Sequence, residues 1–265
     1  MNLNLYLIKH YFRHFFQAHR KGHGIHSPFA YQLCEEVFYN RHPFYELKRL
    51  RDLRQSLSQN NTIIRVEDFG AGSKVFKSNE RVVSQLVKSG TSSVKQSEIL
   101  FRLSNFLNAK TSLELGTSIG LNALYLAMVN SSHKVVSVEG SAELAAFASK
   151  LANDHHCKNL EIKHAKFDEI LPTLLPQLHS IDLLYIDGNH TYEATMRYLQ
   201  LALPYMNKTG VVVLDDIYWS QGMTKAWKEA CELPQVTLSI DGFYFGMLFF
   251  KEELKEKVNL KMMLS

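Results

Sequence analysis

The sequence predicts an α/β fold: a Rossmann-like, doubly wound and mostly parallel sheet that is wrapped by helices and ends in an antiparallel hairpin. From residue 111 onward, short apolar runs alternate with stretches of helical periodicity. The apolar runs lack an in–out alternation, which is typical of strands that are buried on both faces of a parallel sheet. The last two runs, near residues 235–250, are joined by Asp241-Gly242, a dipeptide that favours a hairpin turn.

The order of these runs gives the expected elements. Strands are predicted at residues 112–116, 134–140, 160–165, 181–188 and 210–216, with helices between them at 121–129, 142–154, 167–178 and 191–206. Ahead of them, helices are predicted over residues 79–90 and 97–108. A short strand near residue 63 leads into a glycine loop, residues 66–74, which either closes over a site at the sheet edge or is a structural turn.

The first 60 residues form a helical extension. Apolar residues at helical spacing predict a helix over residues 1–20, which Gly22 and Gly24 end. Ser27 and Pro28 are the expected N-cap and first position of a second helix, and a third is predicted over residues 42–57. We therefore divide the chain into an extension, residues 1–60, and a sheet domain, residues 61–265. A lid, an acceptor-binding element and a dimer contact are candidate roles for the extension.

Charge is distributed unevenly along the 265 residues. Residues 1–110 carry 17 Lys and Arg against 8 Asp and Glu, whereas residues 111–265 carry 13 against 18. The basic part suits an acidic partner such as nucleic acid, an anionic membrane surface or an acidic substrate, and a solvated helical face is the alternative. The three cysteines form no CxxC pair, and no apolar run is long enough to span a bilayer, so we expect a cytoplasmic protein.

A glycine turn, ELGTSIG, occupies residues 114–120 after the first long strand. It lacks one glycine of the dinucleotide fingerprint G-x-G-x-x-G, and no Gly-Lys-Ser/Thr follows it as in a phosphate-binding P-loop. Glu114 stands just before the first glycine, where it would repel a pyrophosphate but suits a cationic ligand. A second acid, Glu139, ends the next strand, where a carboxylate can accept hydrogen bonds from ribose hydroxyls. A turn that only packs helix on strand is the alternative.

These residues resemble the first motif of the class I S-adenosylmethionine-dependent methyltransferases, E/D-x-G-x-x-x-G, which is followed by an acid at the end of the second strand. The resemblance covers residues 90–250 and implies S-adenosylmethionine as the cofactor of a methyltransferase domain. It implies a cofactor site made by Glu114, Gly116, Thr117, Ser118, Gly120, Asn122, Glu139 and Asp187. Lys166 stands about where relatives place an acid near the adenine, which leaves the adenine contacts open.

Carboxylates follow two further strands: Asp187 after IDLLYI, and Asp215 with Asp216 after GVVVL. In a parallel sheet these strand ends lie at the same edge, so the three carboxylates can converge. Such oxygen ligands suit Mg²⁺ or a similar divalent ion, and a cluster of anions would be costly without a cation. They predict a metal site, with simple capping of the strand by Asp215 and Asp216 as the alternative.

This arrangement resembles the metal-dependent O-methyltransferases of the catechol type, in which an aspartate after the fourth strand and an Asp-Asp/Asn pair after the fifth bind the metal. The stretch DGNHTY, residues 187–192, is still more similar to the branch that methylates sugar hydroxyls of macrolides, where a histidine serves as base. The resemblance implies His190 as the general base, Asp187 as a second catalytic residue and a small-molecule hydroxyl as the acceptor. A histidine that only orders the loop is the alternative.

Tyr218 and Trp219 directly follow the aspartate pair and are expected to wall the substrate pocket. We expect the aromatic helix within residues 1–20 to pack on the sheet domain, to make a homodimer or to touch a lipid surface. Two other functions stay open. One is a metal-independent methyltransferase whose basic extension grips RNA, although nucleic acid is the less favoured partner; the other is a non-catalytic cofactor-binding or interaction module.

Overall fold

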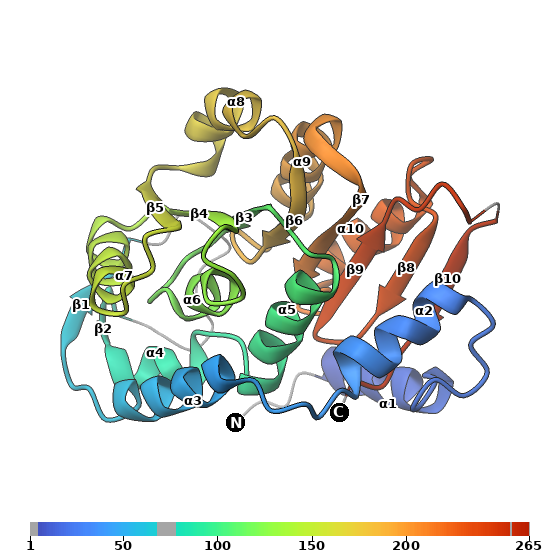
Figure 1. Cartoon of the computed structure of the whole chain (residues 1–265), viewed down its shortest axis with the longest axis horizontal. Helices are drawn as coiled ribbons and strands as arrows, with labels where there is room; N and C mark the ends of the chain where they lie inside the picture. The colour runs from blue at the N-terminus through green and yellow to red at the C-terminus, as the bar shows by residue number, and fades with distance from the viewer. Residues whose placement is uncertain (1–4, 68–77, 255, 265) are drawn as a thin grey trace.

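The computed structural model of the chain describes residues 5–67, 78–254 and 256–264. Its centre is an eight-stranded sheet with the strand order β10-β8-β9-β7-β6-β3-β4-β5 (Figure 1). Its strands are β3 (Thr111–Leu115), β4 (Lys134–Glu139), β5 (Leu160–His164), β6 (Ile181–Ile186), β7 (Met206–Asp215), β8 (Leu238–Asp241), β9 (Phe245–Phe249) and β10 (Val258–Lys261).

The pairing of these strands confirms the predicted fold class. β5, β4, β3, β6 and β7 run parallel to one another, and β9 is antiparallel to both β7 and β8. The strand order reverses between β3 and β6, because the chain builds outward from β3 to β5 and then returns to the other side. Open α/β sheets bind ligands beyond the carboxyl ends of the strands at such a reversal. β10, which pairs parallel with β8 at one edge, was not predicted from the sequence.

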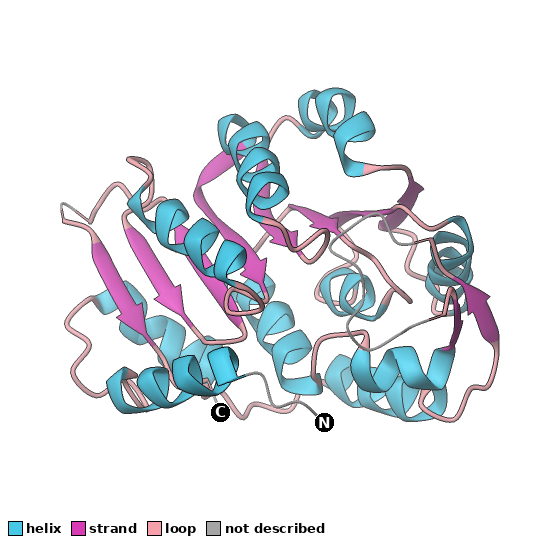
Figure 2. Ribbon diagram, turned by 180° about the vertical axis from the view of Figure 1, so that it is seen from behind, coloured by secondary structure: helices cyan, strands magenta, loops and turns pink. Residues whose placement is uncertain are grey.

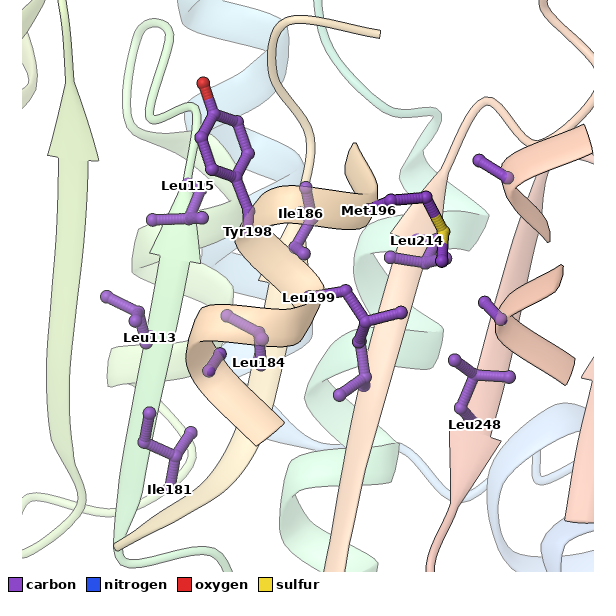
Figure 3. Close-up of a cluster of buried hydrophobic side chains, with 14 of the residues drawn as sticks. Leu113, Leu115, Ile181, Leu184, Ile186, Met196, Tyr198, Leu199, Leu214 and Leu248 are labelled. Carbon is purple, nitrogen blue, oxygen red and sulfur yellow. The ribbon is translucent and has the colours of Figure 1, made fainter. Parts of the chain in front are cut away.

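Helices cover both faces of the sheet (Figure 2). On one face, α8 (Phe167–Leu178), α9 (Tyr192–Ala202) and α10 (Gln221–Glu232) pack on buried strand residues, as Figure 3 shows for Leu199 against Leu184 and Leu214. On the other face lie α2 (Pro28–Leu33), a π-helical turn (Cys34–Phe38) and α5 (Val94–Phe106). A third apolar cluster joins α3 (Tyr45–Leu57), α4 (Val83–Ser89), α6 (Leu121–Ala127) and α7 (Ala142–Asp154). The central strands β3, β4, β6 and β7 are therefore buried on both faces, as their continuous apolar runs predicted, whereas β5 at the edge of the sheet is partly exposed.

The N-terminal helices pack against the C-terminal end of the chain. α1 (Leu5–Gln17) lies at the rim of the molecule near β10, and a short bridge pairs His19 with Met262 (Figure 1). The Ser27 hydroxyl caps α2 by accepting a hydrogen bond of 3.4 Å from the backbone N–H of Ala30, as its position before Pro28 predicted. No helix among the described residues has the length and apolar character needed to cross a membrane.

One predicted element differs in the structure. Residues 79–90 were expected to be helical, but β2 (Glu80–Val82) pairs antiparallel with β1 (Ile63–Arg65), and α4 begins only at Val83. The β-branched residues Ile63 and Val82 are paired in this two-stranded ribbon. Because the two strands are distant in the sequence, no local pattern predicts their pairing. Residues 68–74 of the predicted glycine loop lie outside the described residues; Val66 and Glu67 before them line the cavity described next.

Candidate functional site

A cavity of about 590 Å³ opens beyond the carboxyl ends of the parallel strands, where the strand order reverses. Each central strand contributes a residue to its wall at or just after its last position: Gly116 after β3, Glu139 on β4, Asp187 after β6 and Asp215 on β7. This volume lies in the range of sites for small molecules and cofactors. The cavity therefore stands where the topology alone predicts a ligand site.

Two glycines of the turn after β3 have positive φ angles, and of these Gly116 lines the cavity whereas the predicted cofactor residue Gly120 does not. Gly116 has a φ of +107°, and a Cβ atom on it would lie 2.1 Å from the carbonyl oxygen of Asp187. Gly120 has a φ of +87° and begins α6, where a Cβ atom would lie 2.9 Å from the Cβ of Ala148 on α7. Only glycine fits either backbone, and the first position brings the loops after β3 and β6 into direct contact.

Glu139 ties the glycine turn to the next loop. Its carboxylate accepts hydrogen bonds from the backbone N–H groups of Ser118, at 2.8 Å, and Ser141, at 2.9 Å. Burial raises the pKa of this carboxyl, and the backbone donors act in the opposite direction. Glu139 and Ser118 both line the cavity, so these two predicted cofactor residues are brought together.

Glu114 and Thr117 are not among the residues that line the cavity. Glu114 is fully buried and accepts a hydrogen bond from the Ser137 hydroxyl, which itself lies 2.6 Å from the Thr117 hydroxyl. Burial raises the pKa of Glu114 to about 8, against the effect of the Ser137 hydrogen bond. Its Oε1 atom is buried without a hydrogen-bond partner in the part of the chain that the structure describes.

Asn122 belongs to a buried network of hydrogen-bonded side chains, one of which, Ser92, lines the cavity. Its amide accepts a hydrogen bond of 2.7 Å from Ser97 and donates one of 2.8 Å to Ser92, whose hydroxyl lies 2.9 Å from the hydroxyl of Tyr185. Asn122 itself does not line the cavity, whereas Ser92 does. The predicted cofactor residue Asn122 thus positions a second residue that the sequence did not single out.

Tyr185 joins the two aspartates at the strand ends. Its hydroxyl lies 2.9 Å from Oδ2 of Asp215 and 3.2 Å from Oδ2 of Asp187. Burial, and then the negative charge of the neighbouring aspartates, raise the pKa of the carboxyl groups of Asp187 and Asp215. The pKa of Asp215 rises to about 7. The Oδ1 atom of Asp215 is buried without a hydrogen-bond partner among the described residues. Two crowded carboxylates with a spare oxygen fit a cation, which would relieve their repulsion.

His190 and Asp216 complete this end of the cavity. His190 Nε2 lies 3.7 Å from Oδ1 of Asp187, and the backbones of Asn189 and His190 are both left-handed, with φ of +70° and +44°. Asp216 also lines the cavity and has a φ of +53°. Within residues 5–67, 78–254 and 256–264, no three His, Cys, Asp or Glu side chains are grouped so that they could hold a metal ion by themselves.

The predicted aromatic pair is divided between the cavity and the core. Trp219 lines the cavity together with Tyr244, which the sequence did not single out. Tyr218 points away from it: its side chain is buried, and its hydroxyl donates a hydrogen bond of 2.6 Å to Asp241. On the opposite side, Lys166, Phe167 and Asp168 line the cavity, and Arg197 donates to the carboxylate of Asp168 at 2.7 Å.

Tyr185 was not predicted as a site residue, although its position in the sequence indicates such a role. Tyr185 precedes Asp187 by two positions at the end of a strand, so both side chains point to the same side of the sheet. A tyrosine among apolar strand residues needs a partner for its hydroxyl, and the nearest polar group on that side is the terminal aspartate. Ser92 and Tyr244 lie in loops, and nothing in their local sequence marks them.

Comparison with known proteins gives relatives for the part of the chain that contains this site. Residues 113–217 match the family model described as a methyltransferase domain. An uncharacterised protein, R132, of Acanthamoeba polyphaga mimivirus is 32% identical over 113 residues, which cover 40% of this chain and 51% of that protein. A probable protein arginine N-methyltransferase 3 of Arabidopsis thaliana is 27% identical over 129 residues, which cover 45% of this chain and 21% of that protein. The chain thus spans half or less of the length of these curated relatives.

Solved structures share the fold over most of the chain. The O-methyltransferase TomG of Streptomyces achromogenes, solved with S-adenosylmethionine, superposes with a TM-score of 0.56 at 19% identity, covering 84% of this chain and 95% of that one. An O-methyltransferase of Bacillus cereus superposes with a TM-score of 0.53 at 15% identity, covering 80% of this chain and 93% of that one. Residues 113–217 are therefore similar to a methyltransferase domain, and the chain has the fold of these solved methyltransferases, in agreement with the resemblance that the sequence motifs indicate.

Proposed function

We propose that this chain transfers a methyl group from S-adenosylmethionine to a hydroxyl oxygen of a small molecule, with the assistance of a divalent ion. The observation that carries the proposal is the contact between the glycine turn after β3 and the loop after β6. We infer that Gly116 and Glu139 form the cofactor wall, because they line the same cavity as the titratable groups Asp187, Asp215 and His190. Bound S-adenosylmethionine supplies an electrophilic methyl group on a sulfonium.

The chain's own residues suit each part of this cofactor. Glu139 is held by two backbone N–H groups and faces the cavity, so its remaining lone pairs can accept hydrogen bonds from the ribose hydroxyls. The bare backbone at Gly116 lets the ligand approach closely. Phe167 and Asp168 line the cavity beside Lys166, so we infer that Asp168 is the acid near the adenine.

The acceptor end is defined by the carboxylates and the histidine. Asp187 and Asp215 would hold the divalent ion, which when bound polarises an acceptor hydroxyl. His190 lies at the cavity wall, with Nε2 3.7 Å from Oδ1 of Asp187. His190 would take the proton of the acceptor hydroxyl, while bound S-adenosylmethionine would supply the methyl group, its methyl–sulfur bond breaking to leave S-adenosylhomocysteine. Trp219 and Tyr244 cover the acceptor and exclude water.

The first test is calorimetric titration of the protein with S-adenosylhomocysteine. The wild type should bind, and Glu139→Ala should weaken binding at least about tenfold, since a lost hydrogen bond to a charged group costs about 1.5–3 kcal/mol. Glu161→Ala is the matched control, because Glu161 is an exposed acid on the adjacent strand β5. A folded wild-type protein that does not bind would reject the methyltransferase proposal.

The metal and the base have separate tests in a methyl-transfer assay against a panel of hydroxylated acceptors. Asp215→Asn should abolish the stimulation of turnover by Mg²⁺ and keep the affinity for S-adenosylhomocysteine. His190→Ala should lower kcat and leave that affinity nearly unchanged. Full wild-type turnover under chelation would eliminate the role of the ion, and an equal loss of affinity and turnover in His190→Ala would make that residue structural.

A further inference from the structure

In the part of the chain that the structure describes, the hydrogen bonds from helix α1 to the sheet domain lie on one side of the helix. His14 is buried there, with Nε2 3.1 Å from the carbonyl oxygen of Met262 and Nδ1 3.3 Å from Oδ1 of Asp241. The hydroxyl of Tyr6 donates a hydrogen bond of 2.8 Å to Thr224 on α10. These contacts hold the helix at a defined rotation about its own axis.

The opposite side of α1 is an apolar ridge made by Leu5, Phe12 and Phe16. Their exposed fractions are 80%, 57% and 80%. At about 100° per residue, the three fall within an arc of roughly 40° that points away from His14. The helix is therefore amphipathic in the reverse sense, because its most apolar face points to solvent and its inward face contains a buried histidine. Large apolar side chains aligned in this way mark a contact surface.

The charges around the ridge identify what it contacts. Residues 1–34 contain four Lys and Arg and no Asp or Glu. Lys9 and Arg13 are exposed on α1 beside the ridge, and the guanidinium of Arg20, also exposed, lies 4.4 Å from the ring centroid of Phe15. An apolar stripe bordered by cations alone is typical of a helix that lies in the interface of an anionic membrane.

A second copy of the chain fits this surface less well. In a two-fold contact through the ridge, Lys9 and Arg13 of both copies would come together, and α1 offers no acid to pair with them. The helix has 13 residues and is about 20 Å long, so its ridge alone falls short of the roughly 800 Å² per partner of a stable interface.

We propose that α1 docks the protein on an anionic lipid surface. Leu5, Phe12 and Phe16 enter the boundary between headgroups and acyl chains, while Lys9 and Arg13 contact lipid phosphates. The inference depends on α1 and its charges alone and holds whether or not the chain transfers methyl groups.

Sedimentation with vesicles tests the proposal. The full chain should bind vesicles made of equal parts phosphatidylcholine and phosphatidylglycerol, bind more weakly at high salt, and fail to bind phosphatidylcholine alone. The double variant Phe12→Glu and Phe16→Glu should lose at least about 10-fold in partition coefficient per ring. Lys9→Glu with Arg13→Glu should remove the salt dependence. Tyr45→Glu is the matched control, since Tyr45 is an aromatic residue that is 71% exposed on α3, and it should bind as the wild type does.

Near-UV circular dichroism and Tm establish that each variant is folded, and sedimentation velocity gives the oligomeric state. Wild-type binding that survives the double substitution at Phe12 and Phe16, or that is the same for both lipid compositions, would overturn the proposal. A wild-type dimer that does not bind vesicles, and that becomes monomeric in the double variant, would instead assign the ridge to a second copy.

Discussion

Gly116→Ala tests the close contact on which the proposed site rests. The added Cβ would lie 2.1 Å from the carbonyl oxygen of Asp187, whereas real Cβ atoms essentially never come within 3.0 Å, so the two loops must separate by about 1 Å. That movement stretches the 2.9 Å hydrogen bond from the Asp187 N–H to the Leu115 carbonyl, a loss of about 1 kcal/mol. Alanine at a φ of +107° adds about 1–3 kcal/mol of backbone strain.

Together these effects predict a loss of about 2–4 kcal/mol in the free energy of unfolding, which corresponds to a fall in Tm of roughly 5–15 °C. The affinity for S-adenosylhomocysteine, measured by calorimetry, should fall at least about tenfold because the cavity wall moves. Gly222→Ala is the control: in α10 a Cβ there meets its nearest neighbour at 3.5 Å, so Tm should hold or rise slightly. If Gly116→Ala keeps the wild-type Tm and affinity, the reasoning from the β3–β6 contact is wrong.

Three further outcomes are expected. Tyr185→Phe removes the hydrogen bond that opposes the raised pKa of Asp215, so the acid limb of the pH profile of kcat/KM should move to higher pH. Glu114 keeps its proton in the folded chain up to a pKa of about 8 but loses it near 4.5 when unfolded, so stability should fall as pH rises through this range. Glu114→Gln should flatten that part of a Tm-against-pH curve. Trp227→Ala should lower Tm by roughly 10 °C, because the ring is buried against Gly246.

The sequence predicts those parts of the fold whose signal is local. The strands from β3 to β7 and their helices follow from apolar runs and helical periodicity, and the convergence of Asp187 and Asp215 follows from parallel strands that end at one edge. Gly116 and Gly120 were recognised by their spacing. The structure gives the physical reason, since each allows a backbone approach that any side chain would block.

The remaining features depend on contacts between distant segments or on the rotation of a turn. β1 and β2 pair across residues 66–79, and β10 is a short, half-polar strand, so neither has a periodic pattern to read. Which of Tyr218 and Trp219 faces the cavity depends on the left-handed backbone at Asp216, which composition does not reveal. The outward direction of the α1 ridge depends on where His14 finds its partners, and these lie more than 200 residues away.

The buried contact from His14 through Asp241 to Tyr218 has a thermodynamic consequence. Tyr218 is the chain neighbour of Trp219 in the cavity wall, and Phe243, stacked on Tyr218 at 5.2 Å, is the neighbour of Tyr244 in the same wall. Any force that shifts α1 therefore acts on the residues that touch a bound ligand. Thermodynamic linkage makes such a coupling reciprocal. If binding of lipid to α1 changes the affinity of the cavity for its ligand by some factor, the ligand changes the affinity of α1 for lipid by the same factor. If α1 binds lipid as proposed and the cavity binds its cofactor, the two would form one two-site system, in which each binding event changes the affinity of the other site.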